Sequence, residues 1–152
     1  MNIVESIRAA GVVGAGGAGF PTHVKLSGKA EIIIANGAEC EPLLRVDQLL
    51  MQREAERVVR GVALAMEAVG AARGVIATKT HYRGAVGALQ KALGGRNDIT
   101  LHLMDSYYPS GDEKSIIFEV TGRVVPNGKL PLDVGCVVSN VATLANVSAA
   151  VD

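Results

Sequence analysis

Short apolar segments alternate along the chain with longer amphipathic ones. Residues 47–69 carry apolar side chains at the spacing of one helical face, and residues 82–93 follow a similar amphipathic pattern. Further helices are predicted at the ends of the chain and in its second half, at residues 2–10, 113–121 and 140–150. The apolar segments between the helices have the length of buried strands and lie at residues 31–35, 74–79, 99–104 and 134–138.

This alternation predicts an α/β fold. Strands separated by helices imply βα units, a mainly parallel sheet and helices on both of its faces. We therefore expect one domain, residues 1–152, with a Rossmann-like three-layer sandwich architecture. In such sheets the ligand binds beyond the carboxyl ends of the strands, where loops lead into helices.

Composition narrows the class of protein. Hydrophobic residues make up 49% of the chain and charged residues 20%, with fifteen basic and fifteen acidic side chains. This balance fits a protein with a substantial core, and the absence of long Lys or Arg runs argues against a nucleic-acid partner. The apolar runs are too short to span a bilayer, and the N-terminus does not have the pattern of a signal peptide. We expect a cytoplasmic protein without direct membrane insertion.

The sequence lacks the residue patterns of several common kinds of site. Cys40 and Cys136 are expected to be small buried side chains rather than a disulfide, and two cysteines cannot hold an iron–sulfur cluster. The three histidines do not have the spacing of a metal site, so no metal ligands are expected. No G-x-S-x-G motif supports a hydrolase. Lys79 and Arg83 are expected at a solvated loop edge.

Glycine is concentrated near the N-terminus. The chain contains eighteen glycines, and residues 14–22 read G-A-G-G-A-G-F-P-T, followed by Lys25. A backbone without side chains can approach a phosphate or a flat ring and can direct N–H groups toward an anion. Lys25 would add a positive charge. An ordinary glycine-rich turn is an equal alternative, because neither the P-loop nor the dinucleotide-binding pattern is complete.

Two polar segments follow predicted strands. In N-G-A-E-C-E-P, residues 36–42, Asn36 and Glu39 could hydrogen-bond the polar groups of a ring or a sugar. In S-N-V-A-T, residues 139–143, hydroxyls, an amide and free helix N–H groups could bind a phosphate. Each segment could equally be a solvated turn or a helix cap.

A third polar segment precedes the predicted helix at residues 113–121. It reads Y-P-S-G-D-E-K from Tyr108 to Lys114. The ring of Tyr108 could pack on an aromatic ligand. Asp112 could cap the helix or bind a ribose or a flavin side chain.

Together, in order and spacing, the four segments resemble the FMN-binding domain of the NADH-oxidising flavoprotein subunit of respiratory complex I. The chain is still more similar to the cobalamin reductases of propanediol-utilisation microcompartments and to the C subunits of Rnf ferredoxin–NAD oxidoreductases. The shared strings are G-G-A-G-F-P-T-H-V-K-L at residues 16–26 and E-C-E-P-L-L-R-V-D at residues 39–47. The early glycine loop and G-D-E at residues 111–113 favour the cobalamin reductases.

The resemblance implies FMN as cofactor and NADH as substrate of a flavin oxidoreductase. Position by position, the FMN-binding residues that it implies are Gly14, Gly16, Gly17, Lys25, Asn36, Glu39, Glu41, Tyr108, Gly111, Asp112, Glu113, Ser139, Asn140 and Thr143. NADH would approach the flavin at Phe20, Glu41 and Glu113. Among residues with a catalytic role, Glu39 and Glu41 would tune the local charge, and Lys25 would stabilise the anionic reduced flavin. Ala38 stands where the complex I subunit has an acid, so the resemblance does not carry over the contact of that acid with the ribityl chain or ring.

The resemblance also implies electron transfer from the flavin to an iron–sulfur cluster. Because these residues contain no C-x-x-C-x-x-C run, 4Fe-4S clusters are expected only in another part of a longer polypeptide. The expected final acceptor is a corrinoid, with ferredoxin chemistry of the Rnf type as the alternative. Expected partners are subunits of a redox complex or enzymes of a microcompartment. Outside this class, the chain could be a module that has lost its flavin, while a kinase-like phosphate binder is disfavoured.

Overall fold

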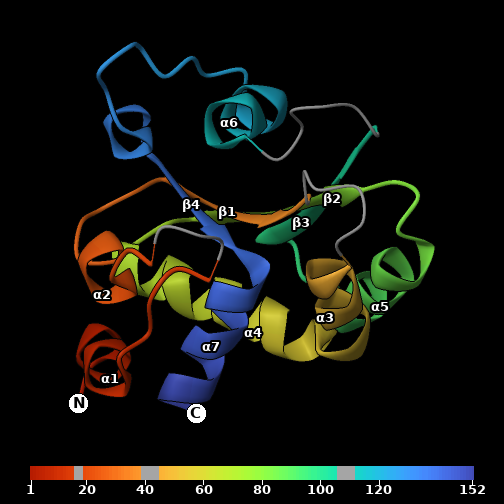
Figure 1. The fold of residues 1–152 in the computed structure, drawn as a ribbon, viewed down its shortest axis with the longest axis horizontal. Coiled ribbons are helices and arrows are strands. Elements are labelled where there is room, and N and C mark those ends of the chain that lie inside the picture. Colours follow the sequence, from red (N-terminus) through yellow and green to blue (C-terminus); the bar gives the residue numbers. More distant parts are fainter. Residues whose placement is uncertain (16–18, 39–44, 106–111) are drawn as a thin grey trace.

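Four parallel strands form the centre of the domain in the order β3-β2-β1-β4 (Figure 1). The computed structural model describes residues 1–15, 19–38, 45–105 and 112–152. Within these ranges the strands are β1 (Ile32–Gly37), β2 (Arg73–Lys79), β3 (Ile99–Met104) and β4 (Cys136–Asn140). Because all four strands are parallel, their carboxyl ends lie at the same edge of the sheet.

Helices cover both faces of the sheet unequally. Figure 1 shows α6 on one face and the larger helical layer, with α3, α4, α5 and α7, on the other. The helices are α1 (Ile3–Ala10), α2 (Thr22–Lys25), α3 (Val46–Arg53), α4 (Ala55–Val69), α5 (Arg83–Leu93), α6 (Glu113–Thr121) and α7 (Val141–Val151), with a 3-10 helix η1 (Pro131–Val134). In the part of the chain that the structure describes, no helix has both the length and the apolar character needed to cross a membrane.

Alternate side chains of each strand enter two separate cores. Ile33 and Ala35 of β1 pack with α4, α5 and α7, whereas Ile32 and Ile34 pack on the α6 side. Burial on both faces explains why the first residues of β1 and β4 are continuous apolar runs, whereas the edge strand β3 is partly exposed. The predicted three-layer α/β sandwich with a parallel sheet is confirmed.

Some predicted element boundaries are wrong. The helix predicted at residues 47–69 is divided at Glu54, whose φ of −122° and ψ of 34° are not helical. The strand predicted at residues 134–138 lies at Cys136–Asn140, because the preceding residues form η1, which ends at Gly135 with a φ of 77°. The short helix α2 was not predicted.

The first strand also continues beyond its predicted end. Asn36 and Gly37 resemble a turn in sequence but belong to β1. A Cβ atom on Gly37 would lie 3.0 Å from the carbonyl oxygen of Ala77 and 2.5 Å from the sulfur of Met51. This glycine therefore serves the close packing of α3 and β2 against β1 rather than a turn.

Gly61 allows α4 and α7 to pack with their backbones in contact. A Cβ atom built on Gly61 would overlap the carbonyl group of Leu144 in α7. α7 begins directly after β4, so its first turn lies at the carboxyl edge of the sheet. The contact with Gly61 therefore fixes the position of α7 at this edge.

Replacing Gly61 by Ala should force α4 and α7 apart and lower the free energy of unfolding by roughly 1–3 kcal/mol. Gly87 provides the matched control, because it lies in α5 and a Cβ atom added to it would meet no atom within 4 Å. Gly87→Ala should stabilise the domain by up to about 1 kcal/mol, since it removes a glycine from a helix interior. Urea unfolding followed by circular dichroism measures both effects. Equal stability of the two variants would contradict the close contact.

Candidate functional site

A cavity of about 240 Å³ lies at the carboxyl ends of β1 and β4, and we call it the carboxyl-end cavity. Each of the four segments identified in the sequence contributes to its wall. The lining residues are Gly14, Gly19, Phe20, Thr22, Lys25, Asn36, Glu113, Val138, Ser139, Asn140 and Thr143. Segments that are far apart in the sequence thus converge on one cavity, as expected for a parallel sheet.

The glycine loop is closed at its base by backbone hydrogen bonds. Gly14 N donates to Phe20 O at 2.8 Å, and Thr22 N donates to Val12 O at 3.1 Å. Gly19 has a φ of 63°, a conformation that favours glycine. The loop therefore has a defined base from which α2 leads away beside the cavity.

The loop is also attached to the first turn of α7. Ala15 N donates a hydrogen bond of 2.9 Å to Oγ1 of Thr143, which is 2% exposed. These residues are 128 positions apart in the sequence. The bond fixes the position of the glycine loop relative to the start of α7.

Asn140 caps α7 at the edge of the cavity. Its Oδ1 accepts a hydrogen bond of 2.7 Å from Ala142 N. The remaining N–H groups of a first helical turn have no acceptor within the helix and carry a partial positive charge. The start of α7 is therefore suited to bind an anionic group.

Asp47 lies behind this cap, on α3. It is 9% exposed, and its Oδ2 accepts a hydrogen bond of 2.8 Å from Nδ2 of Asn140. Burial raises the pKa of Asp47 above the ordinary 3.8, and the bond from Asn140 opposes part of this increase. The carboxylate of Asp47 thus fixes the side chain of Asn140, and its burial costs solvation free energy.

An ion pair links α2 with α6 at the cavity. Lys25 Nζ lies 3.8 Å from Oε1 of Glu113, and the two side chains are 34% and 46% exposed. Solvent screening at this exposure makes the pair weak. Lys25 and Glu113 supply one positive and one negative charge to the described cavity lining, so its net formal charge is zero.

Asn36 and Thr22 also belong to the described part of the wall. Asn36 Oδ1 accepts a hydrogen bond of 3.0 Å from Ala38 N and thereby shapes the end of β1. Thr22 is 2% exposed, and its hydroxyl oxygen has no hydrogen-bond partner within the described ranges. Buried polar atoms almost always have partners, so the Thr22 hydroxyl fits a wall that a polar ligand completes.

The structure places eight of the predicted site residues at the carboxyl-end cavity. They are Gly14, Phe20, Lys25, Asn36, Glu113, Ser139, Asn140 and Thr143. Asp112 does not line this cavity, because its Oδ2 caps α6 through Ser115 N at 3.1 Å and Ser115 Oγ at 3.0 Å. The other predicted site residues lie outside the described residues: Gly16, Gly17, Glu39, Glu41, Tyr108 and Gly111.

Sequence reasoning missed Thr22 and Asp47 and misplaced Lys79. Thr22 was visible as the residue that ends the G-F-P-T string, whereas Asp47 looked like an ordinary acid in the first turn of a helix. The expected solvated position of Lys79 is wrong, since the residue is only 8% exposed at the end of β2. Cys136 is free and fully buried, as predicted, while Cys40 lies outside the described residues.

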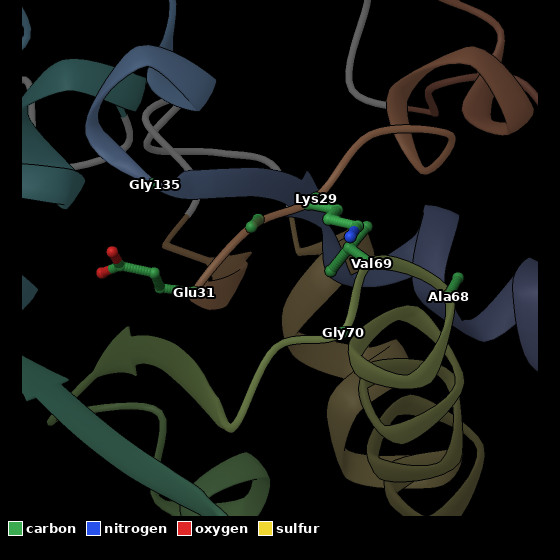
Figure 2. A pocket seen from close by; sticks show the side chains of 7 residues that line it. Lys29, Glu31, Ala68, Val69, Gly70 and Gly135 are labelled. Atoms are coloured by element: carbon green, nitrogen blue, oxygen red, sulfur yellow. The ribbon is translucent and has the colours of Figure 1, made fainter.

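A second cavity of about 480 Å³ lies at the opposite, amino ends of β1 and β4 (Figure 2). It is lined by Lys29, Ala30, Glu31, Ala68, Val69, Gly70 and Gly135. Glu31 points away from Lys29 in Figure 2 and pairs with Arg123 at 2.6 Å. This cavity is larger but contains none of the predicted site residues, so the carboxyl-end cavity is the better candidate.

Comparison with known proteins agrees with the resemblance found in the sequence. The family model of the Nuo51 FMN-binding domain matches residues 7–149. The cobalamin reductase PduS of Salmonella typhimurium is 54% identical over 99% of this chain and 33% of its own length. The C subunit of the Na⁺-translocating ferredoxin:NAD⁺ oxidoreductase complex of Acetobacterium woodii is 45% identical over 96% of this chain and 34% of its own.

A solved structure shares the fold. An NAD⁺-reducing [NiFe]-hydrogenase in the H₂-reduced state aligns with a TM-score of 0.83 and 27% identity, over 97% of this chain and 30% of the hydrogenase chain. The chain spans 33% of the length of the cobalamin reductase that it matches. Since the family model covers nearly all of its residues, the chain belongs to the Nuo51 FMN-binding domain family.

Proposed function

We propose that the carboxyl-end cavity holds FMN and that NADH is oxidised there. The observation that supports this most is the convergence of the four sequence segments on one cavity beside the start of α7. A glycine-rich loop and a helix N-terminus together suit a flat, phosphate-bearing cofactor.

The described residues fit the separate parts of FMN. The first turn of α7, with Ser139 and Asn140, provides N–H and polar groups for the phosphate. Because Gly14 and Gly19 have no side chains, FMN could lie close to the backbone at these two residues. The Thr22 hydroxyl, which has no partner among the residues that the structure describes, would provide a hydrogen-bonding group at the same wall.

The protein contributes binding, orientation and charge to the reaction, while FMN supplies hydride acceptance when bound. Phe20 is 52% exposed at the cavity and can pack against a nicotinamide ring. Lys25 lines the cavity, and its positive charge would stabilise the anionic form of a reduced flavin held there. The roles of Glu39 and Glu41 in tuning the charge, and of Glu113 in NADH binding, rest on the family resemblance.

Beyond this domain, we propose electron transfer through 4Fe-4S clusters in the remainder of a longer polypeptide. A corrinoid is the favoured final acceptor, because identity is 54% to the cobalamin reductase and 45% to the ferredoxin:NAD⁺ oxidoreductase subunit. The Rnf-type complex is the alternative setting. The partners would then be an acceptor protein or the other subunits of that complex. The protein would be located in a microcompartment or on the cytoplasmic side of a membrane complex.

The purified domain should bind FMN and lose flavin absorbance when NADH is added under anaerobic conditions. Titration by flavin fluorescence measures the first property, and absorbance spectroscopy the second. Riboflavin, which lacks the phosphate, should bind more weakly than FMN because it cannot use the start of α7. Absence of FMN binding would refute the proposal. Binding without reduction by NADH would instead identify a module that has lost its catalytic function.

Thr143→Val should weaken FMN binding by about twofold to tenfold, because the substitution keeps the shape but removes the acceptor of the Ala15 N–H group. Thr100→Val is the matched control, since Thr100 is exposed on β3. Fluorescence titration of both variants checks the effect, and circular dichroism confirms that both fold. An unchanged FMN affinity in Thr143→Val would show that the loop does not need this attachment.

Lys25→Met should lower the midpoint potential of bound FMN by an amount on the order of 10–30 mV, because loss of a positive charge disfavours the anionic reduced form. Lys29→Met is the control, because Lys29 lines the cavity at the opposite end of the sheet. Spectroelectrochemical titration measures both potentials. If the two variants gave the same potential as the parent protein, Lys25 would have no electrostatic role at the flavin.

A further inference from the structure

Asp47 is a buried carboxylate that does not line the carboxyl-end cavity. Among the described residues, Asp47 and Lys79 are the charged side chains with the lowest exposure, at 9% and 8%. Burial of an ionised carboxylate costs free energy unless hydrogen bonds or charges compensate. The fold therefore holds a costly group directly behind the cap of α7, where it accepts a hydrogen bond from the side chain of Asn140.

The two hydrogen bonds of Asn140 define one orientation of its amide. Nδ2 donates to Asp47 Oδ2 at 2.8 Å, while Oδ1 accepts from Ala142 N at 2.7 Å. An ionised carboxylate can only accept hydrogen bonds, and a backbone N–H can only donate. A flipped amide would place oxygen against oxygen and N–H against N–H, so Asp47 excludes the flipped state.

We infer that Asp47 is a positioning residue for the phosphate end of the FMN site. It fixes Asn140 from outside the cavity, so that the cap of α7 and the N–H groups of its first turn keep the geometry that a phosphate requires. Asn140 lines the cavity whereas Asp47 does not, so the carboxylate acts through Asn140 rather than on the ligand. This role rests on the proposed binding of FMN.

A purely structural role of Asp47 predicts different effects of its replacement. If the residue served only to join α3 to α7, its loss would lower stability and would affect all ligands of the cavity alike. A positioning role requires a loss of affinity that depends on the phosphate. A positioning role does not require the variant protein to be less stable, because removal of a buried carboxylate also removes the desolvation cost of that carboxylate.

The test compares Asp47→Leu, which has no acceptor, with Asp47→Asn, which can turn its amide oxygen toward Asn140. Asp98→Asn is the control, because Asp98 is exposed and pairs with Arg96 near the amino end of β3. Asp47→Leu should bind FMN about tenfold or more weakly than the parent protein, and Asp47→Asn should remain within about threefold. Riboflavin affinity should be the same in all four proteins, and thermal unfolding should show no loss of stability in Asp47→Asn.

Nuclear magnetic resonance of the flavin-free protein provides a readout that does not depend on FMN. The side-chain amide resonances of Asn140 should shift strongly in Asp47→Leu and stay unchanged in Asp98→Asn. If the parent protein binds FMN and Asp47→Leu binds it equally well, or loses FMN and riboflavin to the same extent, the role of Asp47 is overturned. If the parent protein binds no FMN, the proposed function itself fails, and the resonances alone report whether Asp47 holds Asn140.

Discussion

The parallel pairing of β1 with β4 is the interaction on which the site depends. Its register places Asn36 directly opposite Asn140, although the two residues come from opposite ends of the sequence. β4 ends at Asn140 and β1 ends one residue beyond this pair, at Gly37, so Asn36 and Asn140 reach the same edge of the sheet and line the same cavity. A slip of one residue would turn every side chain of β4 to the other face of the sheet and would remove Asn140 from the cavity.

The start of α7 is then fixed from three directions. The backbone contact at Gly61 sets the distance between α7 and α4. Thr143 accepts a hydrogen bond from the Ala15 N–H group of the glycine loop, and Asp47 accepts one from the side chain of Asn140. Each of these polar groups has a partner, as buried polar groups normally do. The Thr22 hydroxyl at the same wall has none within the described ranges. A wall in which Thr143 and Asn140 are held by hydrogen bonds, while the Thr22 hydroxyl has no partner among the described residues, suits a polar ligand.

The sequence was sufficient to predict the strands, most of the helices and four segments that contribute residues to the carboxyl-end cavity. These features depend on local periodicity and on residue types with strong conformational preferences. The convergence of the segments was also predictable, because parallel strands have their carboxyl ends at one edge.

The details that give the site its shape were not predictable in the same way. The bonds between Asp47 and Asn140 and between Ala15 and Thr143 join residues 93 and 128 positions apart. Nothing in the local pattern around Asp47 distinguishes a buried carboxylate from an acid that favours a helix N-terminus. The break at Glu54 and the burial of Lys79 likewise depend on packing between elements rather than on the periodicity of the chain.

The charges of the cavity indicate how an anion would be held. Lys25 and Glu113 offset each other in the described lining, and both are accessible to solvent, so net charge contributes little attraction. Within the described lining, the attraction for an anion then comes from the N–H groups at the start of α7. Such groups act over short distances and depend on direction. A carboxylate placed behind Asn140 is compatible with this arrangement, because it orients the helix cap without bringing its negative charge into the cavity lining. In a site of this kind, a small rotation of Asn140 would cost more affinity than the loss of a solvent-screened charge at Lys25.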